Sequence, residues 1–132
     1  MITLYLASYN EPWHHGPGRK LAITDSKPDK FEISAAFPPF IPAGNMIDDY
    51  KAKQRINQEE AGKEFVEKYT EQLTIFFIEA QHDAEKEGKP IQKLLPFQDG
   101  DTLLFWERKG YTSYRVILSQ FLIGAGDNII LN

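Results

Sequence analysis

The sequence contains no cysteine, which excludes disulfide bonds, thiolate metal ligands and cysteine nucleophiles. It also lacks any apolar run near the roughly 18 residues that cross a membrane as a helix. Segment 1–8 is apolar but lacks both a basic n-region and an apolar region long enough for a signal peptide, so we expect no signal peptide and a cytoplasmic protein. There is no basic excess, because 15 Lys and Arg face 19 Asp and Glu, for a net charge of −4. We therefore expect neither a membrane nor a nucleic acid as partner.

The composition that remains is typical of one folded domain. Hydrophobic residues make up 42% of the chain and charged residues 26%, which argues against disorder. A chain of 132 residues can bury about two-thirds of its unfolded surface in a single core. We find no internal repeat, and we expect a single α/β domain spanning residues 1–132.

Hydrophobic patterning predicts four short strands. Apolar and polar residues alternate over residues 2–7, and a second strand is expected at residues 20–24. Within a third predicted strand at residues 101–106, residues 103–106 are continuously apolar, which is typical of a strand buried on both faces of a parallel sheet. A small edge strand is expected at residues 128–131.

The strongest helical pattern covers residues 57–87. Its apolar residues recur at steps of three and four, and Asn57 followed by Glu60 resembles a capping box. The pattern fits one long helix or two helices with a bend near Leu73, and Gly88 supplies the stop. Shorter helices are expected at about 45–54 and 113–123. The predicted fold class is therefore α/β, a small compact domain with a short, mostly parallel sheet flanked by helices.

Residues 37–42 contain three prolines and cannot lie inside a helix or a central strand. We expect an extended aromatic connector pressed against the body of the fold. Four aromatic residues are expected to be core rather than stacking surfaces: Trp13, Phe37, Phe40 and Trp106.

A ligand site is expected at the carboxyl ends of the strands, where open α/β sheets bind their ligands. Loops after the three longer strands contribute cations, imidazoles and hydroxyls, which suit an anionic, nucleotide-like ligand. The candidate ligand-binding residues are Ser8, Tyr9, His14, His15, Arg19, Lys27, Ser113 and Arg115.

Glu107 is the candidate catalytic residue, because a carboxyl at the end of a buried strand can acquire a raised pKa and act as general acid or base. A structural salt bridge with Arg108, Lys109 or Arg115 is the alternative. Arg115 lies in the first turn of the predicted last helix, where a cation opposes the helix dipole. We therefore expect a negative partner for it, either Glu107 or a ligand.

No metal or cofactor is expected. Adjacent His14 and His15 point to opposite sides of an extended chain and do not easily face one metal ion. Residues 16–20 lack the spacing of a phosphate-binding P-loop, and residues 124–126 are a helix stop.

The segment 103–122 resembles the C-terminal signature of the domain of unknown function 488 family, and segments 19–28 and 49–73 look similar to it as well. The resemblance implies a small α/β fold of largely uncharacterised function. Glu107 and Arg115 match the family pattern, but Ser113 and Tyr114 stand where the family has Cys-His before the arginine. The chain thus resembles a divergent member, in which chemistry dependent on that cysteine is absent. A shorter branch of the family also lacks the triplet.

Three functions remain open from the sequence. The first is binding of an anionic small molecule at the strand ends. The second is a protein-interaction or inhibitor module, viral or regulatory, that uses the acidic helix and the segment 37–42 on a catalytically degenerate domain. The third is a hydrolase or transferase that uses Glu107.

Overall fold

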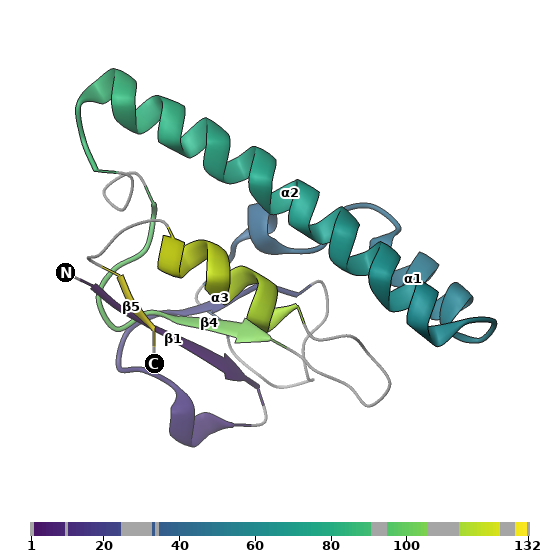
Figure 1. Ribbon diagram of the computed structural model, residues 1–132. Helices are drawn as coiled ribbons and strands as arrows, with labels where there is room; N and C mark the ends of the chain where they lie inside the picture. The colour runs from purple at the N-terminus through teal and green to yellow at the C-terminus, as the bar shows by residue number, and fades with distance from the viewer. Residues whose placement is uncertain are drawn as a thin grey trace.

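The fold is built on a parallel sheet (Figure 1), and the computed structural model describes residues 2–9, 11–24, 33, 35–90, 95–105, 114–124 and 129–131. Its five strands lie in the order β3-β2-β4-β1-β5, and every pairing is parallel. The strands are β1 (Ile2–Ser8), β2 (Lys20–Ala22), β3 (Ala35–Ala36), β4 (Thr102–Phe105) and β5 (Ile129–Leu131). The predicted α/β class with a parallel sheet is confirmed.

The strand β1 lies between β4 and β5. Its pairing with β4 runs from Tyr5 opposite Thr102 to Ser8 opposite Phe105. All four residues of β4 are buried, which confirms the expectation of a strand covered on both faces. The strand β2 ends at Ala22, earlier than predicted, and the two-residue strand β3 was not predicted.

Three α-helices complete the described fold: α1 (Met46–Gln54), α2 (Gln58–Glu87) and α3 (Arg115–Gly124). The helix α2 is continuous over 30 residues, so the alternative of two helices is excluded. Its start is the predicted one, because the Asn57 side chain accepts a hydrogen bond from the Glu60 N–H at 3.1 Å. It ends at Gly88, whose φ of 66° is the left-handed conformation that glycine adopts without steric cost.

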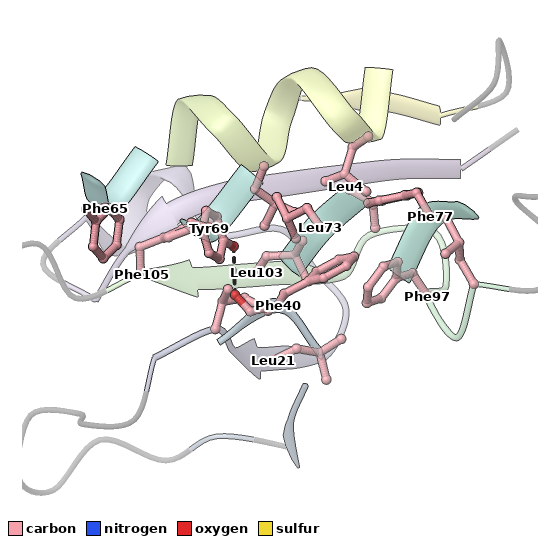
Figure 2. Packing of buried hydrophobic residues seen from close by; sticks show 14 of the residues in the cluster. Leu4, Leu21, Phe40, Phe65, Tyr69, Leu73, Phe77, Phe97, Leu103 and Phe105 are labelled. Carbon is pink, nitrogen blue, oxygen red and sulfur yellow. Dashed lines mark hydrogen bonds between the residues drawn. The ribbon is translucent and has the colours of Figure 1, made fainter. Parts of the chain in front are cut away.

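The main core lies between the sheet and the helices α2 and α3, which pack on the same face (Figures 1 and 2). One cluster joins Leu73 and Phe77 of α2 with Leu118 of α3 and with Leu4 and Leu103 of the strands. Burial of each such side chain stabilises the fold by about 1.5–3 kcal/mol relative to exposure. The described part of the chain therefore has one shared core.

The connection from β1 to β2 lies against the other face of the sheet. Tyr5 and Thr102 point away from the helices because side chains alternate along a strand. The Gly16 N–H donates to Thr102 Oγ1 at 2.7 Å. A Cβ at Gly16 would overlap the Tyr5 ring and the Gly100 carbonyl oxygen, so this close approach requires glycine.

The proline-rich connector contains a 3-10 turn, η2 (Pro38–Phe40), and is pressed against the core as predicted. Phe40 is fully buried, and the Tyr69 hydroxyl of α2 donates to its carbonyl oxygen at 2.7 Å (Figure 2). Pro42 is buried as well. The hypothesis that residues 37–42 form an exposed contact surface is therefore wrong for Phe40 and Pro42, which belong to the core, and stays a prediction for Pro38 and Pro39, which are exposed.

The expectation that Trp13 is a core residue is also wrong. Trp13 lies in a 3-10 turn, η1 (Pro12–His14), and its side chain is 73% exposed. This turn holds no buried residue, so nothing in it draws the indole into the core. Trp106 lies outside the described residues.

Candidate functional site

An ion pair between Arg115 and Glu11 lies at the carboxyl edge of the sheet. Arg115 is the first residue of α3, and its Nη2 donates to Glu11 Oε1 at 3.2 Å. Glu11 belongs to the turn that follows β1, where the Ser8 N–H also donates to Oε1, at 3.1 Å. The Glu11 N–H in turn donates to the Ser8 carbonyl oxygen at 3.0 Å. The expected negative partner of Arg115 is therefore present, but sequence reasoning missed that it is Glu11.

The Arg115 guanidinium also lies over an aromatic ring. Its Cζ is 5.5 Å from the ring centroid of Phe105, the last residue of β4. A guanidinium within about 6 Å of a ring centroid is attracted by the negative face of the ring. The cation is thus held between a carboxylate from the turn after β1 and a ring at the end of β4.

The surroundings of Glu11 favour its ionised form. The hydrogen bond from the Ser8 N–H and the one from Arg115, with the nearby positive charges, lower the pKa of Glu11 against a smaller effect of burial. A carboxyl that stays ionised at neutral pH has no proton to donate, so it is not a general acid. Glu11 therefore acts as a charged anchor for the guanidinium.

Four more predicted site residues gather near this pair. Ser8 and Tyr9 are buried at the end of β1, and burial raises the pKa of the Tyr9 phenol. His15 Nε2 lies 3.0 Å from the Ser8 carbonyl oxygen, within hydrogen-bond distance. His14 Nε2 lies 3.8 Å from Glu11 Oε2. These residues therefore lie near the Glu11–Arg115 pair at the carboxyl edge, and their role in binding a ligand stays a prediction.

Arg19 lies at the opposite edge, so its predicted place in this group was wrong. Its Nη2 donates to Asp101 Oδ2 at 2.6 Å, and its carbonyl oxygen accepts from the Thr102 N–H at 2.8 Å. Both residues stand where β2 and β4 begin. Because parallel strands all start at one edge, the loop after β1 must cross the sheet before β2 begins, and it carries Arg19 to the amino edge.

Asp101 is the buried partner at this amino edge, with 1% of its side chain exposed. Burial alone would raise the pKa of Asp101, but the hydrogen bonds from the Arg19 side chain and from the Gln98 and Arg19 N–H groups outweigh it and lower that pKa. The Arg19–Asp101 pair therefore has a structural role, because it joins the start of β2 to the start of β4.

Three predicted site residues lie outside the described residues: Glu107, Lys27 and Ser113. The catalytic role of Glu107 stays a prediction. Within the described ranges, no group of three His, Cys, Asp or Glu side chains could hold a metal ion. Within the same ranges, no helix has both the length and the apolar character to cross a membrane.

The fold and this edge define a small α/β domain with a parallel sheet and a Glu–Arg pair at the carboxyl ends of two neighbouring strands. No family model, curated protein or solved structure matches the sequence.

Proposed function

We propose that the protein binds an anionic, nucleotide-like small molecule at the carboxyl edge of the sheet, with Arg115 as its anchor. The observation that carries this proposal is the position of the Arg115 guanidinium, held by Glu11 and Phe105 where β1 and β4 end. Open α/β sheets bind their ligands at this edge. Arginine is also the side chain best suited to phosphate and carboxylate groups.

The partial exposure of Arg115 allows a ligand to reach it. Its side chain is 26% exposed, and a guanidinium has five N–H donors in a fixed planar arrangement. An anion can therefore bind beside Glu11 or in its place. Since Glu11 is itself negative, it opposes the approach of an anion, and its replacement by a neutral side chain strengthens binding.

The experiment is a calorimetric titration of the protein with pyrophosphate and with AMP. Arg115→Ala should weaken binding at least about tenfold, the effect of losing hydrogen bonds to a charged group. Glu11→Gln should strengthen it. The matched control is Arg55→Ala, which removes the same charge from an exposed residue at the end of α1.

Two results would reject the proposal. One is a wild-type protein that binds no member of a broad panel of phosphates and nucleotides. The other is an Arg115→Ala variant that stays folded by circular dichroism and binds as tightly as the wild type.

We also propose that the chain is a divergent relative of the domain of unknown function 488 family. What supports this is the match of Glu107 and Arg115 to the family pattern together with the α/β fold. On this proposal Arg115 keeps a ligand-binding role although Cys-His is replaced by Ser113-Tyr114. The prediction of a hydrolase or transferase that uses Glu107 is tested by turnover of a bound ligand, which Glu107→Gln should block without preventing binding.

A second candidate function is protein binding, favoured by the outer surface of α2. Ile75 and Ile78 of α2 are 53% and 63% exposed, and the acidic residues Glu71 and Glu79 are exposed on the same helix. A partner with apolar and basic residues would complement this surface. A double variant, Ile75→Ser with Ile78→Ser, should then lose a bound protein that Arg115→Ala retains. Retention by the double variant would count against this function.

A further inference from the structure

The exposed indole of Trp13 is exceptional in this protein. Among the Phe, Tyr and Trp side chains that the structure describes, Trp13 alone is exposed, and the others are buried or partly buried. A tryptophan has the largest apolar surface of any side chain, so leaving it in water forgoes much stabilisation. Such a side chain is a candidate contact for a flat ligand or a partner.

Two backbone hydrogen bonds close the turn that carries Trp13, and a contact of His15 joins the turn to the end of β1. The His14 N–H donates to the Glu11 carbonyl oxygen at 2.9 Å, and the His15 N–H donates to that of Pro12 at 3.1 Å. His15 Nε2 contacts the Ser8 carbonyl oxygen at 3.0 Å. Pro12 restricts the backbone at the start of the turn. The exposed ring therefore stands on a constrained backbone, and a preorganised contact loses little entropy on binding.

A continuous chain of contacts joins the indole to the proposed anion anchor. The ring centroids of Trp13 and His14 are 6.0 Å apart. His14 Nε2 lies 3.8 Å from Glu11 Oε2, and Glu11 Oε1 accepts from Arg115 at 3.2 Å. The Trp13 ring of the turn after β1 and the Arg115 cation of α3 are therefore linked through His14 and Glu11 at the carboxyl edge.

We infer that Trp13 is the base-stacking half of a nucleotide site whose phosphate half is Arg115. This inference rests on the proposed anion binding and names its ligand class, a mononucleotide with a flat base and a phosphate. The base stacks on the indole, and the phosphate accepts from the guanidinium. A nucleotide is favoured over a simple anion because it alone uses both features.

The test compares AMP with ribose 5-phosphate, which has the same sugar and phosphate but no base. In calorimetric titrations the wild type should bind AMP about tenfold or more tightly than ribose 5-phosphate, the usual effect of base–aromatic stacking. Trp13→Ala should bring AMP down to the affinity of ribose 5-phosphate. Trp13→Phe should keep part of the preference for AMP over ribose 5-phosphate. Arg115→Ala should weaken the binding of both ligands.

The outcomes separate this inference from the proposed function. The stacking role is rejected if Trp13→Ala binds AMP as tightly as the wild type does. It is also rejected if the substitution weakens the binding of ribose 5-phosphate as much as the binding of AMP. In both cases anion binding at Arg115 stands. Equal affinity of the wild type for the two ligands rejects the stacking role as well and leaves the indole as a surface for a protein. If the wild type binds neither ligand, the stacking role is rejected, and anion binding at Arg115 is rejected with it when pyrophosphate and the wider panel do not bind either.

Discussion

At the scale of single residues, the carboxylate of Asp101 is a polar constraint that holds two strands together. It accepts hydrogen bonds from the Arg19 side chain at 2.6 and 3.2 Å and from the Arg19 and Gln98 N–H groups at 3.1 and 2.8 Å. A buried carboxylate is tolerated only when it is paired and hydrogen-bonded in this way. Asp101 thereby joins the starts of β2 and β4.

Asp101→Ala should lower the free energy of unfolding by about 3 kcal/mol, because it leaves buried N–H donors and a guanidinium without their acceptor. Chemical denaturation measures the change. The matched control is Asp83→Ala, at an exposed position of α2, which should change stability by less than about 0.5 kcal/mol. Equal effects of the two substitutions would contradict the structural role of Asp101.

The sequence predicts that Arg115 has a negative partner, but it does not identify that partner as Glu11. Sequence reasoning identified that a cation in the first turn of a helix needs a negative partner. It considered Glu107, which is near in the chain, whereas Glu11 is 104 residues away. Glu11 faces Arg115 because its hydrogen bonds with Ser8 close a turn at the end of β1, and hydrophobic patterning does not reveal such a turn. The Ser-x-x-Glu spacing of residues 8–11 is the available clue, since it is typical of a closed turn.

At the scale of elements, α1 and α2 are joined by a cluster of exposed charges. Glu64 of α2 is hydrogen-bonded to Lys53 of α1, and it contacts Lys68 at 2.8 Å within its own helix. Lys68 lies 3.8 Å from Asp49 of α1. The hydrogen bond from Lys53 and then the one from Lys68 lower the pKa of Glu64 from 4.5 to about 2.

This shift predicts an acid-sensitive contribution to stability. The pKa of Glu64 is lower in the folded state, so the unfolded state takes up the proton first as the pH falls. The contribution is complete above about pH 4.5 and is lost between pH 4.5 and 2. Glu64→Gln should therefore show a weaker loss of stability on acidification than the wild type, measured by denaturation at pH 6 and pH 3.5.

The control for this prediction is Glu67→Gln, an exposed position one residue before Lys68. It should keep the acid sensitivity of the wild type. If Glu64→Gln and the wild type lose stability in parallel as the pH falls, the ion cluster does not hold α1 against α2.

The elements were the most predictable part of the fold. The sequence of α2 marks both ends of the helix, since Asn57 caps its start and Gly88 ends it, with an apolar stripe between them. The central strands show equally local patterns. The strand β3 has only two residues, Ala35 and Ala36, and both are exposed, so no hydrophobic pattern marks it.

At the scale of the whole molecule, the order of the strands decides which loops can meet. Because β1 and β4 are parallel neighbours, the turn after β1 and the start of α3 meet at the carboxyl edge. The same parallel order carries Arg19 to the amino edge, where β2 starts. Sequence reasoning placed all residues of one loop at one edge, which fails for a connection long enough to cross the sheet.

The exposed state of Trp13 is a second property that arises only at this scale. Composition favours an aromatic side chain in the core, and Phe40 and Phe105 conform to that rule. Trp13 lies in the turn η1, which follows the carboxyl end of β1 and contributes no residue to the core between the sheet and the helices α2 and α3. Its exposure follows from the path of the chain and not from local sequence.

A crystal structure of the protein with AMP tests the central claim most directly, because it shows where a bound phosphate lies. The account predicts density for the phosphate within hydrogen-bond distance of the Arg115 guanidinium, at the carboxyl ends of β1 and β4, with the base against Trp13. Density for AMP only at the amino edge beside Arg19, or at surface lysines of α1 and α2, would contradict it.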